Sequence, residues 1–183
     1  SNFSTNLKGD DYLNFFRSED VYLKNISFED VIFDAIDSDF SNLNIINSSF
    51  KNIGNDAIDG SGSRISISNS YFENVLDKAI SAGENSNFIV LNSLFISNEI
   101  ALVTKDGSTL TSNNNTLKKN NLDLASFIKK KYYDNPSVTI TNTSISNYLL
   151  EKNTSVKGID SVEFSFDVES KLYGNLYGTA SER

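Results

Sequence analysis

The sequence has 183 residues, with 24 Asp and Glu against 16 Lys and Arg and no His, so its formal net charge is −8 at pH 7. This length fits one domain, and the negative charge argues against nucleic acid and anionic membrane surfaces as partners. The absence of Cys and His excludes disulfides, Cys-ligated zinc and thiol catalysis, and it removes the commonest general base. Because no apolar run approaches the roughly 18 residues of a spanning helix, we expect no membrane insertion.

The chain repeats itself with a period of about 22 residues. Each copy begins at an Asn, and the steps between these residues are 22, 22, 23, 22 and 28 residues. The six positions are Asn25, Asn47, Asn69, Asn92, Asn114 and Asn142. An earlier, poorer copy is expected from Phe3 to Lys24, where Asp11–Asn14 takes the place of Asp56–Asp59. The long last step indicates an insertion.

Every copy contains three short stretches in which apolar residues alternate with polar ones. The first precedes the Asn, as in Val21/Leu23, Leu43/Ile45, Ile65/Ile67, Phe88/Val90 and Val138/Ile140. The second follows the Asn and is centred on Phe28, Phe50, Phe72, Phe95, Leu117 and Ile145. The third is centred on Ile36, Ile58, Ile80, Leu102 and Leu124. Period-two alternation predicts strands with one buried face, so each copy should contain three strands and three turns.

The predicted fold is all-β: a right-handed parallel β-helix of about six to seven rungs, stacked about 4.8 Å apart as neighbouring strands are. Equivalent residues of successive rungs then form ladders. The Phe ladder becomes an internal aromatic stack. The Asn ladder supplies the left-handed conformation of a sharp turn, and its amides bond to the Asn above and below, leaving few buried polar groups unpaired.

The 22-residue spacing and the Asn ladder resemble the pectate-lyase-like, right-handed β-helix superfamily over residues 3–163. The strings NDAID, DKAISAGENS and TKDGS are similar to repeats in uncharacterised bacterial surface-type proteins. The resemblance implies an exported or cell-surface location, and a ligand that lies across one parallel sheet and its flanking loops. The superfamily's catalytic patterns Gly-His-Gly, Arg-Ile-Lys and Asp-Pro-His-Glu are absent from the sequence. The resemblance therefore covers the scaffold and not the known active sites.

The two ends of the sequence interrupt the repeat. We expect residues 1–163 to form the β-helix and residues 164–183 to form a C-terminal cap. Helix-like spacing of Leu172, Tyr173, Leu176 and Tyr177 favours a short amphipathic helix in that cap. The start has no comparable segment, so we expect further rungs or another domain to precede Ser1 in the natural protein.

The insertion before the last Asn is basic and aromatic, which is unusual in an acidic chain. Its distinctive residues are Lys129, Lys130, Lys131, Tyr132 and Tyr133. One interpretation is a binding loop that presents Lys charge and Tyr rings to a carbohydrate acid or a protein partner. The other is a solvated excursion whose lysines offset nearby Asp.

The third strand carries acidic residues on its expected outer face. If Ile36 and Ile58 point inward, alternation places Ala35, Asp37, Ala57 and Asp59 outside. The outer column then reads Asn14, Asp37, Asp59, Ser81, Val103 and Ala125, with Asp39, Ser61, Gly83 and Lys105 beside it. Asp37 and Asp59 could share a calcium ion completed by Asp34, Asp56 or Asp39. The competing interpretation is ordinary turn chemistry without a ligand.

Three functions remain open. The leading hypothesis is a non-catalytic β-helix module of a larger exported or surface bacterial protein, which is a rigid scaffold or binds polysaccharide or another domain of its chain. It needs no cofactor beyond an optional calcium ion. The alternative is a calcium-assisted lyase or epimerase acting on uronic-acid polymers, whose base would be Lys78, Lys105 or Arg64. A third hypothesis is a structural stalk or a unit that oligomerises through its exposed end.

Overall fold

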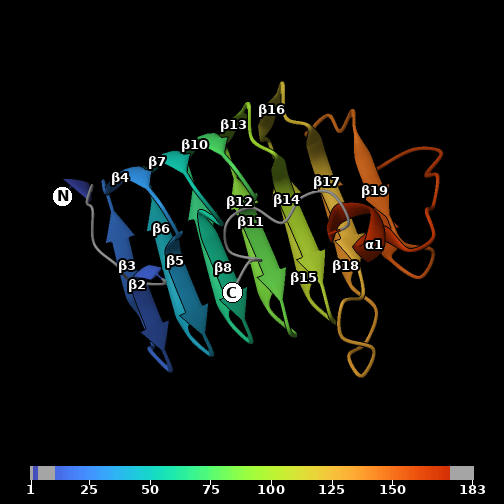
Figure 1. Ribbon diagram of the computed structural model, residues 1–183, viewed down its shortest axis with the longest axis horizontal. Coiled ribbons are helices and arrows are strands. Elements are labelled where there is room, and N and C mark those ends of the chain that lie inside the picture. Colours follow the sequence, from blue (N-terminus) through green and yellow to red (C-terminus); the bar gives the residue numbers. More distant parts are fainter. Residues whose placement is uncertain (1, 4–10, 174–183) are drawn as a thin grey trace.

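The computed structural model describes residues 2–3 and 11–173, which form a parallel β-helix with three sheets along its length (Figure 1). Sheet A contains β1 (Asn2–Phe3), β4 (Ser27–Val31), β7 (Ser49–Ile53), β10 (Tyr71–Val75), β13 (Leu94–Ile96) and β16 (Thr116–Lys118). Sheet B contains β2 (Asp11–Phe16), β5 (Asp34–Asp39), β8 (Ile58–Ser61), β11 (Lys78–Gly83), β14 (Ile100–Lys105), β17 (Leu122–Phe127) and β19 (Tyr148–Leu150). Sheet C contains β3 (Val21–Lys24), β6 (Asn42–Ile46), β9 (Arg64–Ser68), β12 (Asn87–Leu91), β15 (Thr109–Asn113), β18 (Ser137–Thr141) and β20 (Ser155–Lys157).

Each strand pairs in parallel with the strand one period away, so the predicted parallel β-helix and its register are confirmed. Phe28 faces Phe50 in sheet A and Ile36 faces Ile58 in sheet B, each one period apart. The step departs from this period in the last rungs, where Thr109 faces Ser137 and Ser137 faces Ser155. Sheets B and C each have seven strands among the described residues, which corresponds to about seven turns. No helix among these residues is long and apolar enough to cross a membrane.

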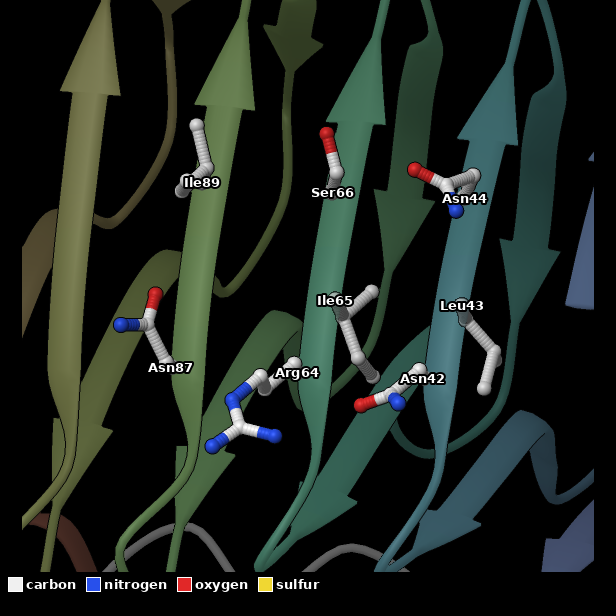
Figure 2. Close-up of a pocket in the computed structure, with 8 residues that line it drawn as sticks. All are labelled: Asn42, Leu43, Asn44, Arg64, Ile65, Ser66, Asn87 and Ile89. Carbon is white, nitrogen blue, oxygen red and sulfur yellow. The ribbon is translucent and has the colours of Figure 1, made fainter. Parts of the chain in front are cut away.

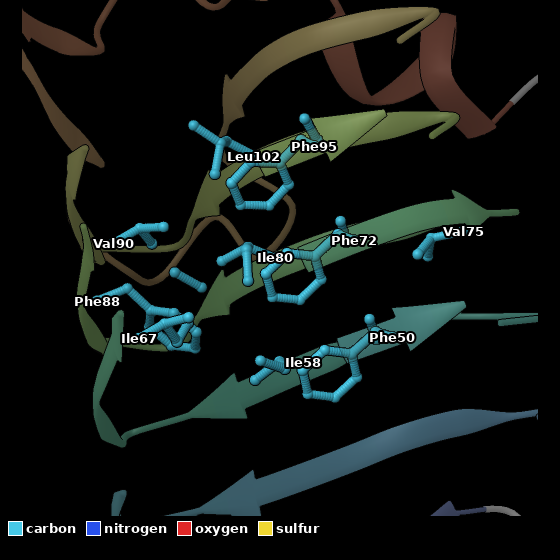
Figure 3. Close-up of a cluster of buried hydrophobic side chains, with 14 of the residues drawn as sticks. Phe50, Ile58, Ile67, Phe72, Val75, Ile80, Phe88, Val90, Phe95 and Leu102 are labelled. Atoms are coloured by element: carbon cyan, nitrogen blue, oxygen red, sulfur yellow. The ribbon is translucent and has the colours of Figure 1, made fainter. Parts of the chain in front are cut away.

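The core is a column of apolar side chains inside the coil (Figure 3). The predicted Phe stack lies at its centre. The ring centroids of Phe28 and Phe50 are 5.2 Å apart, those of Phe50 and Phe72 4.8 Å, and those of Phe72 and Phe95 4.6 Å. All four rings are fully buried. The rung spacing thus stacks one ring per turn in nearly parallel planes.

The six ladder Asn residues have the left-handed backbone that the sequence predicts, with φ between 46° and 55°. Two of the expected amide contacts are present, from Asn47 Nδ2 to Asn25 Oδ1 at 2.5 Å and from Asn114 Nδ2 to Asn92 Oδ1 at 2.7 Å. The side chains are exposed, however, so this ladder runs along the outside of the turn. The expectation that it satisfies buried polar groups is wrong.

Two ladders of buried serine residues satisfy the buried backbone groups instead. The buried Ser70 Oγ accepts a hydrogen bond from the backbone N–H of Ser48 at 3.2 Å, and Ser93 Oγ accepts one from Ser70 N–H at 3.1 Å. A second ladder at the corner between sheets B and C links Ser41, Ser63, Ser86 and Ser108 in the same way. Each hydroxyl satisfies a backbone donor one rung away at a corner where no strand partner is available.

Two strand expectations are wrong. Ile145 lies outside any strand, so the last rung has no sheet A strand among the described residues. Ala35 and Ala57 do not face outward; both are fully buried in the main core beside Ile36 and Ile58. Two consecutive residues point inward where the chain turns from sheet A into sheet B. This local break in alternation places Asp34 on the outer face together with Asp37.

The C-terminal helix α1 (Val168–Tyr173) packs on the outer face of sheet B and not on the end of the stack. Val168 and Leu172 contact a second buried cluster that includes Val103, Ala125 and Phe127. Figure 1 shows α1 in front of β17. The predicted helix therefore exists but begins at Val168, whereas Leu176 and Tyr177 lie outside the described residues.

Candidate functional site: the Asp–Lys face of sheet B

The outer face of sheet B carries a charged surface that we call the Asp–Lys face. Its residues are Asp34, Asp37, Asp39, Asp56, Asp59, Lys78, Lys105 and Lys129. The acidic residues come from β5 and β8 and the turn before β8, whereas the first two lysines come from the following strands, β11 and β14. Opposite charges therefore occupy neighbouring stretches of one sheet.

Asp56 and Lys78 form a buried ion pair at the start of β11. The Lys78 ammonium Nζ and backbone N–H both lie 3.0 Å from Asp56 Oδ1, and Lys78 also pairs with Asp77. Burial raises the pKa of Asp56 to about 7, against the opposing attraction of the Lys78 ammonium. Removing one partner of such a pair would leave a buried charge uncompensated.

Lys105 reaches back across two rungs toward Asp59. Its Nζ lies 4.0 Å from Asp59 Oδ1, although β14 and β8 are separated by β11. The path passes over Gly83, where an added Cβ would lie 2.9 Å from Lys105 Cε. Burial by itself would raise the pKa of Asp59, but the ammonium groups of Lys105 and Lys78 outweigh it and lower that pKa below its usual value.

The remaining acids repel one another. Burial raises the pKa of Asp34 to about 8, with added repulsion from Asp56 and Asp59. Burial also raises the pKa of Asp37 to about 7, with added repulsion from Asp59 and Asp39. Asp37 Oδ2 accepts a hydrogen bond from Asn14 Nδ2 at 2.7 Å. Asp34 and Asp37 are thus partly protonated near neutral pH, while Asp59 is ionised.

The insertion between β17 and β18 joins this face. The backbone N–H groups of Lys129 and Lys130 donate to Oδ1 of the buried Asp106 at 2.8 and 2.7 Å, which fixes the start of the loop. Burial and the nearby ammonium groups of Lys105 and Lys78 lower the pKa of Lys129. Lys130 pairs instead with Glu84 at the corner between sheets B and C.

The two tyrosines of the loop contact each other. Their ring centroids are 4.8 Å apart and their planes are tilted by 37°. Tyr132 is 80% exposed, and Lys131 is also exposed. The loop therefore presents one exposed aromatic ring, and Asp106 fixes the first residues of the loop.

Comparison with known families decides the classification. The family described as right handed beta helix region matches residues 13–175, which is most of the chain. The chain belongs to the right-handed β-helix family. No curated protein matches it significantly.

Within this right-handed β-helix, the predicted carboxylates do line up. Asn14, Asp37, Asp59, Ser81, Val103 and Ala125 face one another in register as expected. No group of three or more acidic residues in the described part of the chain converges as a metal site would require. Calcium binding by Asp37 and Asp59 therefore stays a prediction that needs either a water-filled shell or rearrangement.

Three features of the right-handed β-helix escaped the sequence analysis. Arg64 points from β9 on sheet C and is not part of the Asp–Lys face, so it is removed from the candidate bases. Lys129 belongs to the face, where burial and the ammonium groups of Lys105 and Lys78 lower its pKa. Helix α1 covers Val103 on β14 and Ala125 on β17, so these two outward positions are closed to a ligand. Among the contacts of this face, the Lys105–Asp59 pair is the one for which the sequence gave a signal. The small residues Ser81 and Gly83 leave room for the Lys105 side chain to lie flat on the sheet.

Proposed function

We propose that this right-handed β-helix is a non-catalytic module of an exported or surface protein and that it binds glycan at the Asp–Lys face and the adjoining Tyr132. One observation carries the proposal: Lys78 and Lys105, the two lysines that the sequence offers as bases, lie beside the carboxylates of Asp56 and Asp59. An amine accepts a proton only after losing its own, and a neighbouring carboxylate favours the charged form.

The same face suits reversible recognition of sugar hydroxyls. The partly exposed Asp37, Asp39, Asp59 and Lys129 offer acceptors and a donor, whereas Asp56, Lys78 and Lys105 are buried beneath them. Tyr132 adds a flat apolar ring with a polar tip, which can pack on the face of a pyranose ring. Because the strands are parallel and stacked, the polar groups stay fixed, so binding requires little ordering of the protein.

The test is calorimetric titration of the protein with soluble neutral and uronic-acid polysaccharides, with and without calcium. We expect saturable binding to at least one polymer, and Tyr132→Ala should weaken it by on the order of tenfold. Tyr71→Ala is the matched control because Tyr71 lies on sheet A next to Lys51. Equal losses in the two variants, or no binding to any polymer, would contradict the proposal.

The lowered pKa of Lys129 favours a second candidate, a lyase or epimerase in which Lys129 removes the proton beside a uronate carboxylate. Incubation with uronic-acid polymers should then give unsaturated ends, detected by absorbance, or exchange of solvent deuterium into the sugar, detected by NMR. Lys129→Met should abolish turnover, whereas Lys131→Met should not. Absence of both signals in the wild type would remove this candidate.

A further inference from the structure

The outer face of sheet C is free of acidic side chains, although the protein has 24 Asp and Glu. Along β3, β6, β9, β12, β15, β18 and β20, every outward position is a hydroxyl, an amide, an apolar residue or a cation. The cations are Lys24, Arg64 and Lys157. We call this surface the acid-free face. It is the described surface on which an anionic ligand would meet least repulsion.

A shallow open groove of about 330 Å³ lies on this face around Arg64. Figure 2 shows Arg64 on the middle strand, with Asn42 and Asn87 on the strands to either side. Arg64 is exposed and takes part in none of the ion pairs among the described residues. Its guanidinium fork therefore stands between two amides with its charge uncompensated by any described carboxylate.

The next outward position on each of these strands lies two residues further along the chain and also belongs to the groove. Asn44 and Ser66 offer polar groups, and Ile89, which is 40% exposed, offers an apolar patch. Hydroxyls continue the row at Thr111 and Thr139. These positions recur once per rung, about 4.8 Å apart, which is close to the length of one pyranose unit in an extended chain.

We propose that the acid-free face binds a linear polysaccharide bearing carboxylate or sulfate groups, with one oxyanion held by Arg64 and flanked by Asn42 and Asn87. The planar guanidinium can donate two parallel hydrogen bonds to either group. The chain runs along the stack, so that successive sugars meet successive rungs, and the apolar face of one sugar packs on Ile89. This site is separate from the Asp–Lys face and does not depend on it.

A polysaccharide fits the face better than an acidic peptide. An extended peptide binds sheets by adding to an edge through backbone hydrogen bonds, whereas this surface is the middle of a sheet whose backbone groups are already paired. The outward residues are short and polar, which suits hydroxyl groups and leaves no deep pocket for peptide side chains.

The test is binding of polygalacturonate, dextran sulfate, neutral dextran and polyglutamate to the whole chain at low and physiological salt. We expect one or both anionic polysaccharides to bind, with dextran and polyglutamate at least about tenfold weaker. Arg64→Gln should reduce binding by about tenfold or more, and Arg64→Lys should recover only part of it because it keeps the charge without the fork. Lys51→Gln, which removes one charge on sheet A, should leave binding unchanged.

A second variant guards against an indirect effect. Ser66→Glu places a carboxylate beside Arg64 at an outward position, so it should abolish binding while the melting temperature stays the same. Equal binding of polyglutamate and the polysaccharides, equal effects of Arg64→Gln and Lys51→Gln, or no binding of either anionic polymer would overturn the proposal. Tyr132→Ala tests glycan binding at the Asp–Lys face. A negative result with that variant therefore does not change how the Arg64 variants are interpreted.

Discussion

Asp34 accepts hydrogen bonds through Oδ1 from the Asn55 amide at 2.6 Å and from the backbone N–H of Asp56 at 2.8 Å. It also faces Asp11 across the strand pair β2–β5. Burial, followed by repulsion from Asp56 and Asp59, raises its pKa from 3.8 to about 8. The folded protein therefore keeps a proton that the unfolded chain has lost. The contribution of this group to stability is complete below about pH 4 and is lost as the pH rises toward 8.

Asp34→Asn should remove this pH dependence. The amide oxygen can still accept both hydrogen bonds, and the charge repulsion disappears. We expect the free energy of unfolding to rise by about 1 kcal/mol or more at pH 8 and to change little at pH 4. Denaturant unfolding of the wild type and of Asp34→Asn at both pH values measures this change in the free energy of unfolding. Asp30→Asn is the matched control, because Asp30 is exposed and accepts a similar bond from Asn52; an equal gain there would refute the explanation.

At the scale of the structural elements, two adjacent ladders differ in what they contribute. Asn69 is exposed with φ 51°, so it contributes to stability by adopting the left-handed backbone of the turn. Ser70 is buried and accepts the Ser48 N–H. Ser70→Ala leaves that donor unpaired and should cost about 1–3 kcal/mol. Asn69→Gly should cost only a few tenths, since glycine adopts this conformation freely.

Thermal unfolding distinguishes the two variants, because 1 kcal/mol corresponds to a shift of about 2–4 °C in a protein of this size. We expect a clear shift for Ser70→Ala and almost none for Asn69→Gly. The reverse order would mean that the outer Asn ladder stabilises the stack and that the inner hydroxyls do not.

These ladders also show how far the sequence could predict the fold. The Phe stack and the Asn turns follow from residues that recur with the period, so strand order and register could be predicted. Ser48, Ser70 and Ser93 recur just as regularly, but their role depends on which corner of the rung is closed from solvent. Alternation also failed at Ala35, because a bend between sheets lets two consecutive residues point inward.

The candidate site was less predictable than the fold because, apart from the Asp56–Lys78 pair, its contacts join residues that are not one period apart. Lys105 pairs with Asp59 two rungs away only because Gly83 leaves room. Lys129 reaches the same face from a unique insertion held by Asp106. The docking of α1 on sheet B likewise depends on a segment outside the repeat. Periodicity carries no information about such contacts.

At the scale of the whole molecule, the strands of each rung pair only with those of neighbouring rungs, so the chain should behave as a stack of exchangeable units. Deletion of residues 25–46 removes one complete period and joins Lys24 to Asn47. The Phe column, the serine ladders and the Asp56–Lys78 pair all persist, and the repelling group Asp34, Asp37 and Asp39 is lost. We expect a folded protein that unfolds cooperatively at a lower temperature.

Deletion of residues 25–35 is the decisive control, because it removes half as many residues but not a whole period. It joins Lys24 to Ile36, so one rung loses its sheet A strand β4 and the Phe28 ring of the stack. The backbone groups of the neighbouring strand then lack partners, which costs more than the loss of a complete rung. Circular dichroism and thermal melting of both variants test this. If the 11-residue deletion were the milder one, stacking of complete rungs would not be what stabilises the protein.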